Sequence, residues 1–115
     1  MKDLSEIEGK PRCHCGIFGI FGHPDASLMT YYGLHALQHR GQEASGIVTS
    51  EFIPDRDKWR FNVHKSNGLV AEVFKDEKIL KNHLKGSSAI GHNRYSTTGS
   101  AENKFNIQPF IVNYR

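Results

Sequence analysis

Cys15-Gly16-Ile17-Phe18-Gly19-Ile20-Phe21-Gly22 is the stretch that decides the fold. Its glycines allow close backbone approach, and its bulky apolar residues favour a strand. A cysteine at the head of such a strand is usually structural, because free cysteine is among the most buried residue types. The stretch alone therefore predicts a first strand and leaves the role of Cys15 open.

The composition is that of one globular domain. The chain has 115 residues, of which 37% are hydrophobic and 23% charged, and these values are ordinary for a folded protein. No apolar run reaches the length of a membrane span, and Met1–Lys10 lacks the apolar core of a secretory signal. We therefore expect no membrane partner and a cytoplasmic protein.

Charge and cysteine usage exclude further classes. The net charge of +3 is mild and the basic residues are scattered, which argues against nucleic acid as a partner. The only two cysteines, Cys13 and Cys15, are too close together to join distant parts of a fold, which suits a reducing compartment. No second cysteine pair completes a four-ligand set, and the seven histidines are dispersed, so we predict no metal site.

The order of the expected elements predicts an α+β sheet with helices packed against one face. A helix is expected over Ala26–Gln38, with Asp25 as its N-cap, Gly33 at a close contact with the sheet and Gly41 as its C-cap. The segments that follow are an antiparallel hairpin (Ser45–Phe52 and Trp59–Val63), a turn at Asn67-Gly68, an interrupted helix (Leu69–Leu84), a short strand (Ser88–His92) leading into a loop (Asn93–Gly99), and the start of a strand at Phe110–Val112.

Three polar clusters could carry chemistry: Cys15, Gln38–Glu43 and Gly91–Gly99. A nucleophile, an arginine and a hydroxyl-rich loop could hold a small substrate with a carboxylate, because the guanidinium fork matches a carboxylate in bidentate fashion. The alternative is that Arg40 and Arg94 are surface residues that pair with acidic neighbours.

The motifs Cys15–Gly19, Leu37–Gly46 and Gly91–Gly99 resemble, in the same order, those of the glutaminase domain of class II glutamine amidotransferases, which are N-terminal-nucleophile hydrolases. His39–Glu43 and Glu102–Pro109 resemble most the branch that makes phosphoribosylamine for purine synthesis. The resemblance implies an αββα sandwich that is present only in part, because the chain ends inside the domain. Residues 1–14 would be a leader or propeptide, and residues 15–115 the N-terminal portion of the glutaminase domain.

The resemblance also assigns roles to residues. Cys15 would be the nucleophile, and removal of residues 1–14 would free an α-amine whose pKa of about 7.7–8.0 suits a general base. The remaining predicted site residues surround the glutamine. Those that bind it are Arg94, which would hold the α-carboxylate, then Thr97, Arg40 and Gly41; Tyr95 and His92 would support Arg94.

Partners and cofactors follow from the resemblance too. Glutamine would bind this chain, which needs no cofactor, whereas phosphoribosyl pyrophosphate would bind only the missing C-terminal domain. The full-length parent would be a homo-oligomer that uses magnesium, and whether it also has an iron–sulfur cluster is open. The family's Asn-Gly oxyanion pair and the acidic residue that holds the substrate amine lie beyond residue 115, so we expect this chain alone to be nearly inactive. Alternatives are a non-catalytic glutamine-binding or interaction module and a fragment of another class II amidotransferase.

Overall fold

The computed structural model describes residues 15–38, 41–95 and 107–111. Its regular elements follow in chain order. They are β1 (Gly16–Phe21), α2 (Ala26–Ala36), β2 (Gln42–Ile53), the 3-10 turn η1 (Pro54–Arg56), β3 (Lys58–Asn67), α3 (Val70–Val73), the π-helical turn η2 (Ile79–His83) and β4 (Ser88–Tyr95).

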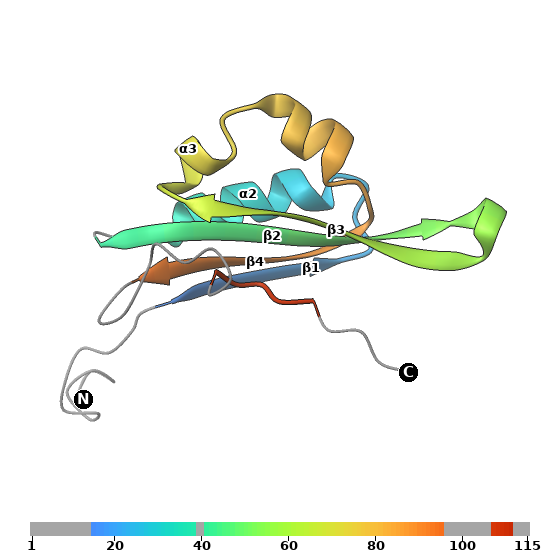
Figure 1. Ribbon diagram of the computed structural model, residues 1–115, viewed down its shortest axis with the longest axis horizontal. Helices are drawn as coiled ribbons and strands as arrows, with labels where there is room; N and C mark the ends of the chain where they lie inside the picture. The colour runs from blue at the N-terminus through green and yellow to red at the C-terminus, as the bar shows by residue number, and fades with distance from the viewer. Residues whose placement is uncertain (1–14, 39–40, 96–106, 112–115) are drawn as a thin grey trace, which may run out of the picture.

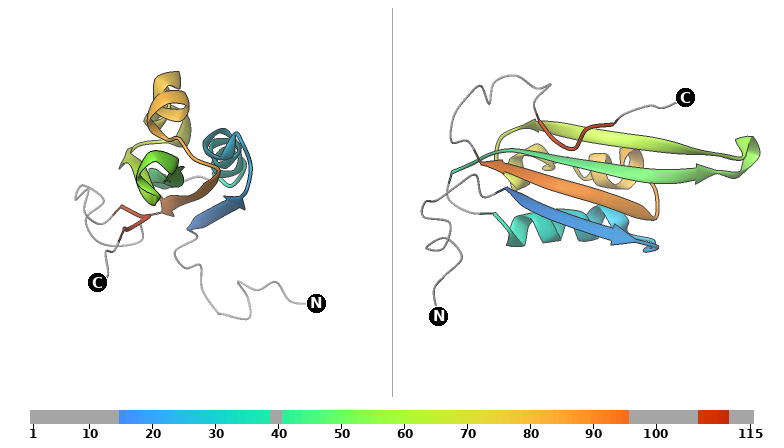
Figure 2. Two further views of the ribbon diagram at one scale, coloured as in Figure 1. Left: turned by 90° about the vertical axis from the view of Figure 1, so that its right-hand side faces the viewer. Right: turned by 90° about the horizontal axis from the view of Figure 1, so that it is seen from below.

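The four strands form one antiparallel sheet in the order β1-β4-β2-β3. The helical segments α2, α3 and η2 all lie on one face of it (Figure 1). Residues 107–111 cross the opposite face, which we call the open face (Figure 2, right). There the carbonyl oxygen of Gln108 lies so close to Gly46 that a Cβ at Gly46 would meet it. The predicted α+β sheet with helices on one face is confirmed.

The core lies between the helical segments and the sheet. Its fully buried apolar side chains include Leu34, Ile47, Val70 and Leu84. Two glycines allow α2 to approach the strands closely. A Cβ at Gly33 would run into the ring of Phe18, as the expected close contact required, and a Cβ at Gly91 would lie 2.6 Å from Thr30 Cγ2 and 2.7 Å from Leu34 Cδ1.

The ends of α2 differ from the sequence prediction. Asp25 does occupy the N-cap position, but its side chain makes no capping hydrogen bond, and its backbone N–H instead donates to His23 Nδ1 at 2.9 Å. The helix ends at Ala36 with Leu37 as its C-cap, so Gly41 is not the C-cap. Gly41 has φ +92° and lies directly before β2, in a conformation that favours glycine.

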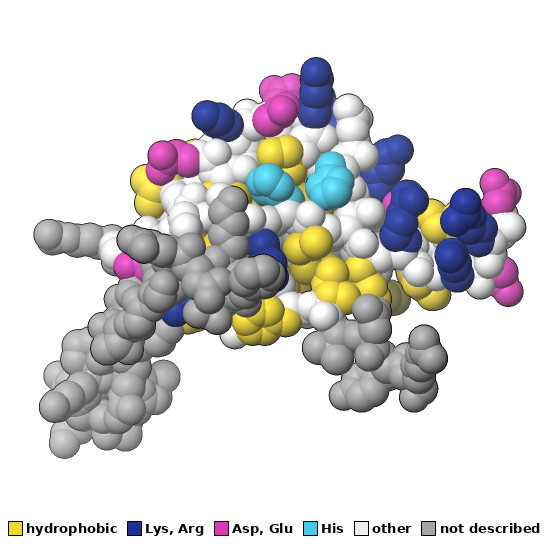
Figure 3. Space-filling model, viewed as in Figure 1, with side chains coloured by type: hydrophobic (Ala, Val, Ile, Leu, Met, Phe, Trp, Pro, Cys, Tyr) yellow, Lys and Arg dark blue, Asp and Glu magenta, His cyan; other side chains and the backbone are white. Residues whose placement is uncertain are grey.

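The predicted hairpin is confirmed and is longer than expected, because β2 and β3 stay paired from Ala44↔Asn67 to Ile53↔Lys58. Its tip projects beyond the sheet (Figure 1), and charged side chains of both signs gather around that tip (Figure 3). The helical interruption within Leu69–Leu84 is confirmed as well, since α3 and η2 are separate elements.

Strand β4 corrects the prediction that matters most for the site. It runs to Tyr95, so Asn93, Arg94 and Tyr95 belong to a strand rather than to a loop. The strand continues this far because β4 lies between β1 and β2, and its backbone pairs with both of these strands. The strand expected at Phe110–Val112 is also wrong where it can be compared, because Phe110 and Ile111 are not in a strand, and Val112 lies outside the described residues.

Candidate functional site

Those predicted site residues that the structure describes, namely Cys15, Gly41, His92, Arg94 and Tyr95, lie at one end of the sheet, where β1 and β2 begin and β4 ends. The register pairs Gly16 of β1 with Asn93 of β4. Continuing it by one residue brings Cys15 level with Arg94. On the other side of β4, Ala44 of β2 pairs with Arg94, and Gly41 lies directly before that strand. Three segments far apart in the sequence therefore meet here, and we call this region the site end.

Alternation along the strands places Cys15 and Arg94 on the same face. Asn93 points toward α2, because its Nδ2 donates to Leu34 O. Gly16 faces α2 too, since its Cβ would lie 3.1 Å from Leu37 Cβ. Successive residues of a strand point to opposite faces, so their neighbours Cys15 and Arg94 face the open side. Cys15 is exposed, and its interpretation as a buried structural cysteine is wrong.

Arg94 is flanked by two side chains that bind the last turn of α2. Asn93 Nδ2 donates to Leu34 O at 2.8 Å, and the Tyr95 hydroxyl donates to Leu37 O at 2.9 Å. Ser45 Oγ donates to Asn93 Oδ1 at 2.9 Å, and both residues are fully buried. Tyr95 thus lies where a support of Arg94 is needed. Sequence reasoning did not identify Asn93 and Ser45 as site residues. Asn93 directly precedes Arg94 in the chain, and Ser45 pairs with Asn93 across β2 and β4.

His92 lies on the open face, level with Ile17 of β1 and Gly46 of β2. It is buried, and burial lowers the pKa of its imidazole below the ordinary value; the nearby positive charge of Arg94 lowers that pKa further. The neutral ring therefore persists to a lower pH than that of a solvated histidine.

The segment around Gly41 is tethered on both sides to the start of α3. Before it, Gln38 Oε1 accepts a hydrogen bond from the Val70 N–H at 3.1 Å. After it, Gln42 Nε2 donates to Gly68 O at 2.8 Å, and the Gly68 N–H donates to Glu43 O at 2.6 Å. These bonds hold Gln38, Gln42 and Glu43 against the segment that leads into α3.

Buried polar atoms without a hydrogen-bond partner are concentrated at the site end. Within the part of the chain that the structure describes, they are Gln42 Oε1, Glu43 Oε2 and His92 Nδ1. Most buried polar atoms in folded proteins have a partner, and exceptions often mark functional sites. His92 is two residues before Arg94 on β4, and Gln42 and Glu43 directly follow Gly41, so all three belong to segments that meet at the site end.

Two of the predicted site residues, Arg40 and Thr97, lie outside the residues that the structure describes. Among residues 15–38, 41–95 and 107–111, no group of three or more His, Cys, Asp or Glu side chains is placed to hold a metal ion. Over the same ranges, no helix is both long and apolar enough to cross a membrane.

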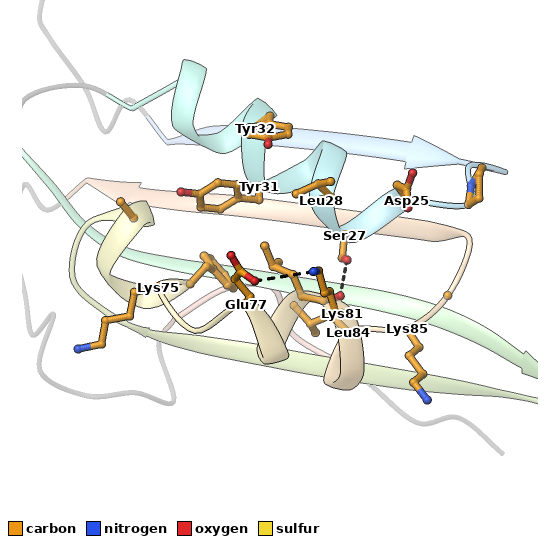
Figure 4. Close-up of a pocket in the computed structure, with 15 residues that line it drawn as sticks. Asp25, Ser27, Leu28, Tyr31, Tyr32, Lys75, Glu77, Lys81, Leu84 and Lys85 are labelled. Atoms are coloured by element: carbon orange, nitrogen blue, oxygen red, sulfur yellow. Dashed lines mark hydrogen bonds and ion pairs between the residues drawn. The ribbon is translucent and has the colours of Figure 1, made fainter.

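A hollow with a volume of about 870 Å³ lies elsewhere, between α2 and residues 71–86 on the helix-covered face of the sheet (Figure 4). Ser27 Oγ donates to Leu80 O at 2.9 Å across it, and Lys81 pairs with Glu77 at 3.7 Å on its rim. None of the predicted site residues lines it. The strand register, rather than the size of a hollow, defines the candidate site.

The chain is similar to known proteins over nearly all of its length. It is 46% identical over 108 residues to an amidophosphoribosyltransferase of Bacillus subtilis (strain 168), a match that covers 94% of this chain and 21% of that protein. It is 48% identical over 113 residues to amidophosphoribosyltransferase 2, chloroplastic, of Arabidopsis thaliana, with 98% of this chain and 19% of that protein covered. No family model matches the chain.

A solved structure agrees with these relatives. It is titled as the glutamine phosphoribosylpyrophosphate amidotransferase of B. subtilis complexed with ADP and GMP, and it aligns with a TM-score of 0.67 and 40% identity. The match covers 86% of this chain and 19% of that one. The resemblance predicted from three motifs is therefore confirmed, and the chain spans about a fifth of the length of the relatives it matches.

Proposed function

We propose that this chain, similar over nearly its whole length to amidophosphoribosyltransferases, is the nucleophile-bearing part of their glutaminase domain, which in the full-length parent acts on the side-chain amide of glutamine. The observation that carries the proposal is the β1·β4 register, which brings Cys15 level with Arg94 on one face. A thiol nucleophile and a carboxylate-binding cation side by side suit an amino-acid substrate.

Arg94 binds the α-carboxylate of glutamine through its guanidinium fork. Arg94 pairs with Ala44 of β2, and the preceding Asn93 pairs with both Gly16 of β1 and Ser45 of β2, so the guanidinium starts from a fixed point. Thr97, Arg40 and Gly41 complete the glutamine pocket, and Tyr95 and His92 support Arg94. The pKa of His92 is lowered, so its ring is neutral near neutral pH and does not compete with Arg94 for the carboxylate.

Cys15 attacks the side-chain carbonyl carbon of glutamine. Once residues 1–14 are removed, the α-amine of Cys15 accepts the thiol proton and a carbon–sulfur bond forms. The α-ammonium then gives that proton to the amide nitrogen as the carbon–nitrogen bond breaks, which releases ammonia. Water then attacks the γ-glutamyl thioester, which releases glutamate and restores the thiol. The exposure of Cys15 suits attack on a substrate that arrives from solvent.

In the parent protein, the ammonia reacts with phosphoribosyl pyrophosphate to form phosphoribosylamine in purine synthesis. Phosphoribosyl pyrophosphate, magnesium and an iron–sulfur cluster, if the parent has one, bind outside residues 15–115. The parent is a homo-oligomer in the cytoplasm. The competing proposal is a non-catalytic glutamine-binding module, in which residues 1–14 are retained. Intact mass of the purified chain separates the two, because the enzyme begins at Cys15.

The function is tested by measuring how L-glutamine protects Cys15 from alkylation by neutral iodoacetamide. Arg94→Gln is expected to raise the concentration that gives half-protection by roughly 10- to 100-fold, because a hydrogen bond to a charged group contributes about 1.5–3 kcal/mol. The α-amide of L-glutamine, which lacks the carboxylate, should protect poorly.

The matched control is Arg60→Gln at the far end of the hairpin, where the exposed Arg60 pairs with Glu51 at 2.8 Å. That variant should keep the protection of the native chain. Equal protection of native chain and Arg94→Gln, or equal protection by glutamine and its α-amide, would contradict the proposed role of Arg94.

A further inference from the structure

Asn93 and Ser45 form a buried hydrogen bond on the face of the sheet opposite to Arg94. The sequence motifs do not identify this pair. Asn93 is fully buried between β1 and β2, where it pairs with Gly16 on one side and Ser45 on the other. Ser45 is fully buried too, and its hydroxyl donates to Asn93 Oδ1. This bond fixes which end of the carboxamide points toward α2.

The other end of the carboxamide satisfies a helix terminus. The last four carbonyls of a helix lack partners within the helix. Leu34 O is one of them in α2, and it accepts from Asn93 Nδ2 at 2.8 Å. One residue beyond Arg94, the Tyr95 hydroxyl binds Leu37 O in the same way. The strand is therefore anchored to α2 immediately before and immediately after Arg94.

We propose that Asn93, oriented by Ser45, is the positioning residue for Arg94, and that Asn93, Ser45 and Leu34 O together form a clamp that sets its carboxylate-binding geometry. Side chains on opposite faces of a strand turn together about the strand axis, so a fixed Asn93 fixes the direction in which Arg94 leaves the sheet. A fully satisfied buried network is well suited to such fixing.

The same clamp also reaches the nucleophile. Asn93 is paired in register with Gly16, the residue next to Cys15. Gly16 has no side chain, and Leu37 lies against the space that one would fill. Asn93 thus ties together the strand that carries Arg94, the strand that follows Cys15, and the end of α2 that leads toward Gly41.

The clamp rests on the proposed function, since it concerns the arginine that would bind glutamine. The test is chosen so that failure of the clamp and failure of the proposed function give different results. The 115-residue chain is assayed for protection of Cys15 from iodoacetamide by L-glutamine and by its α-amide. The discrimination ratio is the half-protecting concentration of the α-amide divided by that of L-glutamine, so a larger ratio means a stronger preference for the carboxylate. Asn93→Leu, which has a similar volume but no amide, is expected to reduce this ratio about tenfold, the effect of one lost hydrogen bond to a well-ordered partner. Ser45→Ala should lower it in the same direction by less.

The matched control is Thr49→Val. Thr49 is also fully buried on the helix-facing side of β2, and its hydroxyl donates to Lys85 O at 2.6 Å, but it lies far from the site end. It should lower the melting temperature without changing the discrimination ratio, which separates positioning from a merely structural role.

An unchanged ratio in folded Asn93→Leu overturns the clamp while the proposed function stands. If Asn93→Leu fails to fold, Ser45→Ala decides, and an unchanged ratio there overturns the clamp equally. A native chain that L-glutamine does not protect overturns the proposed function, and the clamp with it.

Discussion

Single residues at the site end take their roles from alternation along paired strands. Asn93 and Tyr95 bind α2, and Arg94 between them faces the other way. A shift of the register by one residue would turn Arg94 into the helix-covered face and Asn93 to the open face. The buried bonds to Leu34 O and Leu37 O make that shift costly, because each would leave polar groups unpaired.

His92 gives a prediction of pH dependence. Burial lowers its pKa in the folded chain, so the unfolded chain binds its proton at a higher pH than the folded chain does. The resulting contribution to stability is complete above the unfolded value of about 6.5 and is lost as the pH falls toward the lowered pKa.

Replacing His92 by Gln should therefore flatten the fall of the unfolding free energy below about pH 6.5. Urea unfolding at a series of pH values measures it, and His35→Gln, at an exposed position of α2, controls for the loss of one histidine. A His92→Gln chain with the same acid limb as the native chain would contradict the burial of a neutral imidazole.

The candidate site residues could be proposed from the sequence, whereas their structural surroundings could not. Cys15, Arg94 and Gly41 stand in motifs with a family pattern, so their types and order sufficed. The clamp of Asn93 and Ser45 depends on which face each side chain occupies. The prediction that Asn93 lies in a loop gave no information about which face its side chain occupies, because side chains alternate between two faces only in a strand.

At the scale of elements, the approach of α2 to β4 determines where the site residues lie. Gly91 makes that approach possible, since Thr30 and Leu34 of α2 occupy the space of its missing side chain. Both of these residues are fully buried. The end of α2 then reaches Asn93 and Tyr95 at hydrogen-bonding distance.

Gly91→Ala should destabilise the chain by about 1–3 kcal/mol, the usual cost of overpacking a well-packed core. Gly19→Ala is the matched control on β1, where the nearest atom to a new Cβ would be Ala89 O at 3.9 Å. That substitution should leave stability unchanged or raise it by about 0.5–1 kcal/mol, because alanine costs less entropy than glycine in a strand. Denaturant unfolding of the two variants measures the difference, and equal effects would argue against close packing at Gly91.

The sequence predicted the types of the helices and strands better than it predicted the residues at which they end. The hairpin and the interrupted helix have strong local patterns, with alternation in one and two apolar patches in the other. The end of β4 is set by two neighbouring strands, and a single segment carries no sign of its partners. The end of α2 at Ala36 likewise depends on contacts with β4 that lie about sixty residues away in the chain.

On the scale of the whole molecule, the open face has an apolar part and a polar part. Toward the hairpin, its side chains are apolar and exposed, including Phe21, Phe61 and Ile90, and Phe21 is 90% exposed. Toward the site end it carries His92, Arg94 and Cys15. An apolar sheet face of this kind normally packs against another layer. The second sheet of the αββα sandwich that the family resemblance implies would cover this part.

We expect the 115-residue chain to self-associate through the apolar part of the open face. Phe21→Lys should reduce the association seen by light scattering at increasing protein concentration, without lowering the melting temperature, because Phe21 contributes little buried surface. Tyr32→Lys is the control, since Tyr32 is exposed on α2, on the other side of the sheet. A native chain that stays monomeric throughout would contradict this expectation.

The central claim is that Cys15 is a nucleophile beside a glutamine-binding arginine, and labelling by a diazoketone analogue of L-glutamine tests it most directly. Such labelling requires both a reactive thiolate and a formed pocket. Intact mass and peptide mapping should show one label per chain at Cys15, with a rate that saturates as the analogue concentration rises and falls when L-glutamine is added. Labelling that is unsaturable, insensitive to L-glutamine, or retained in Cys15→Ala would contradict the account.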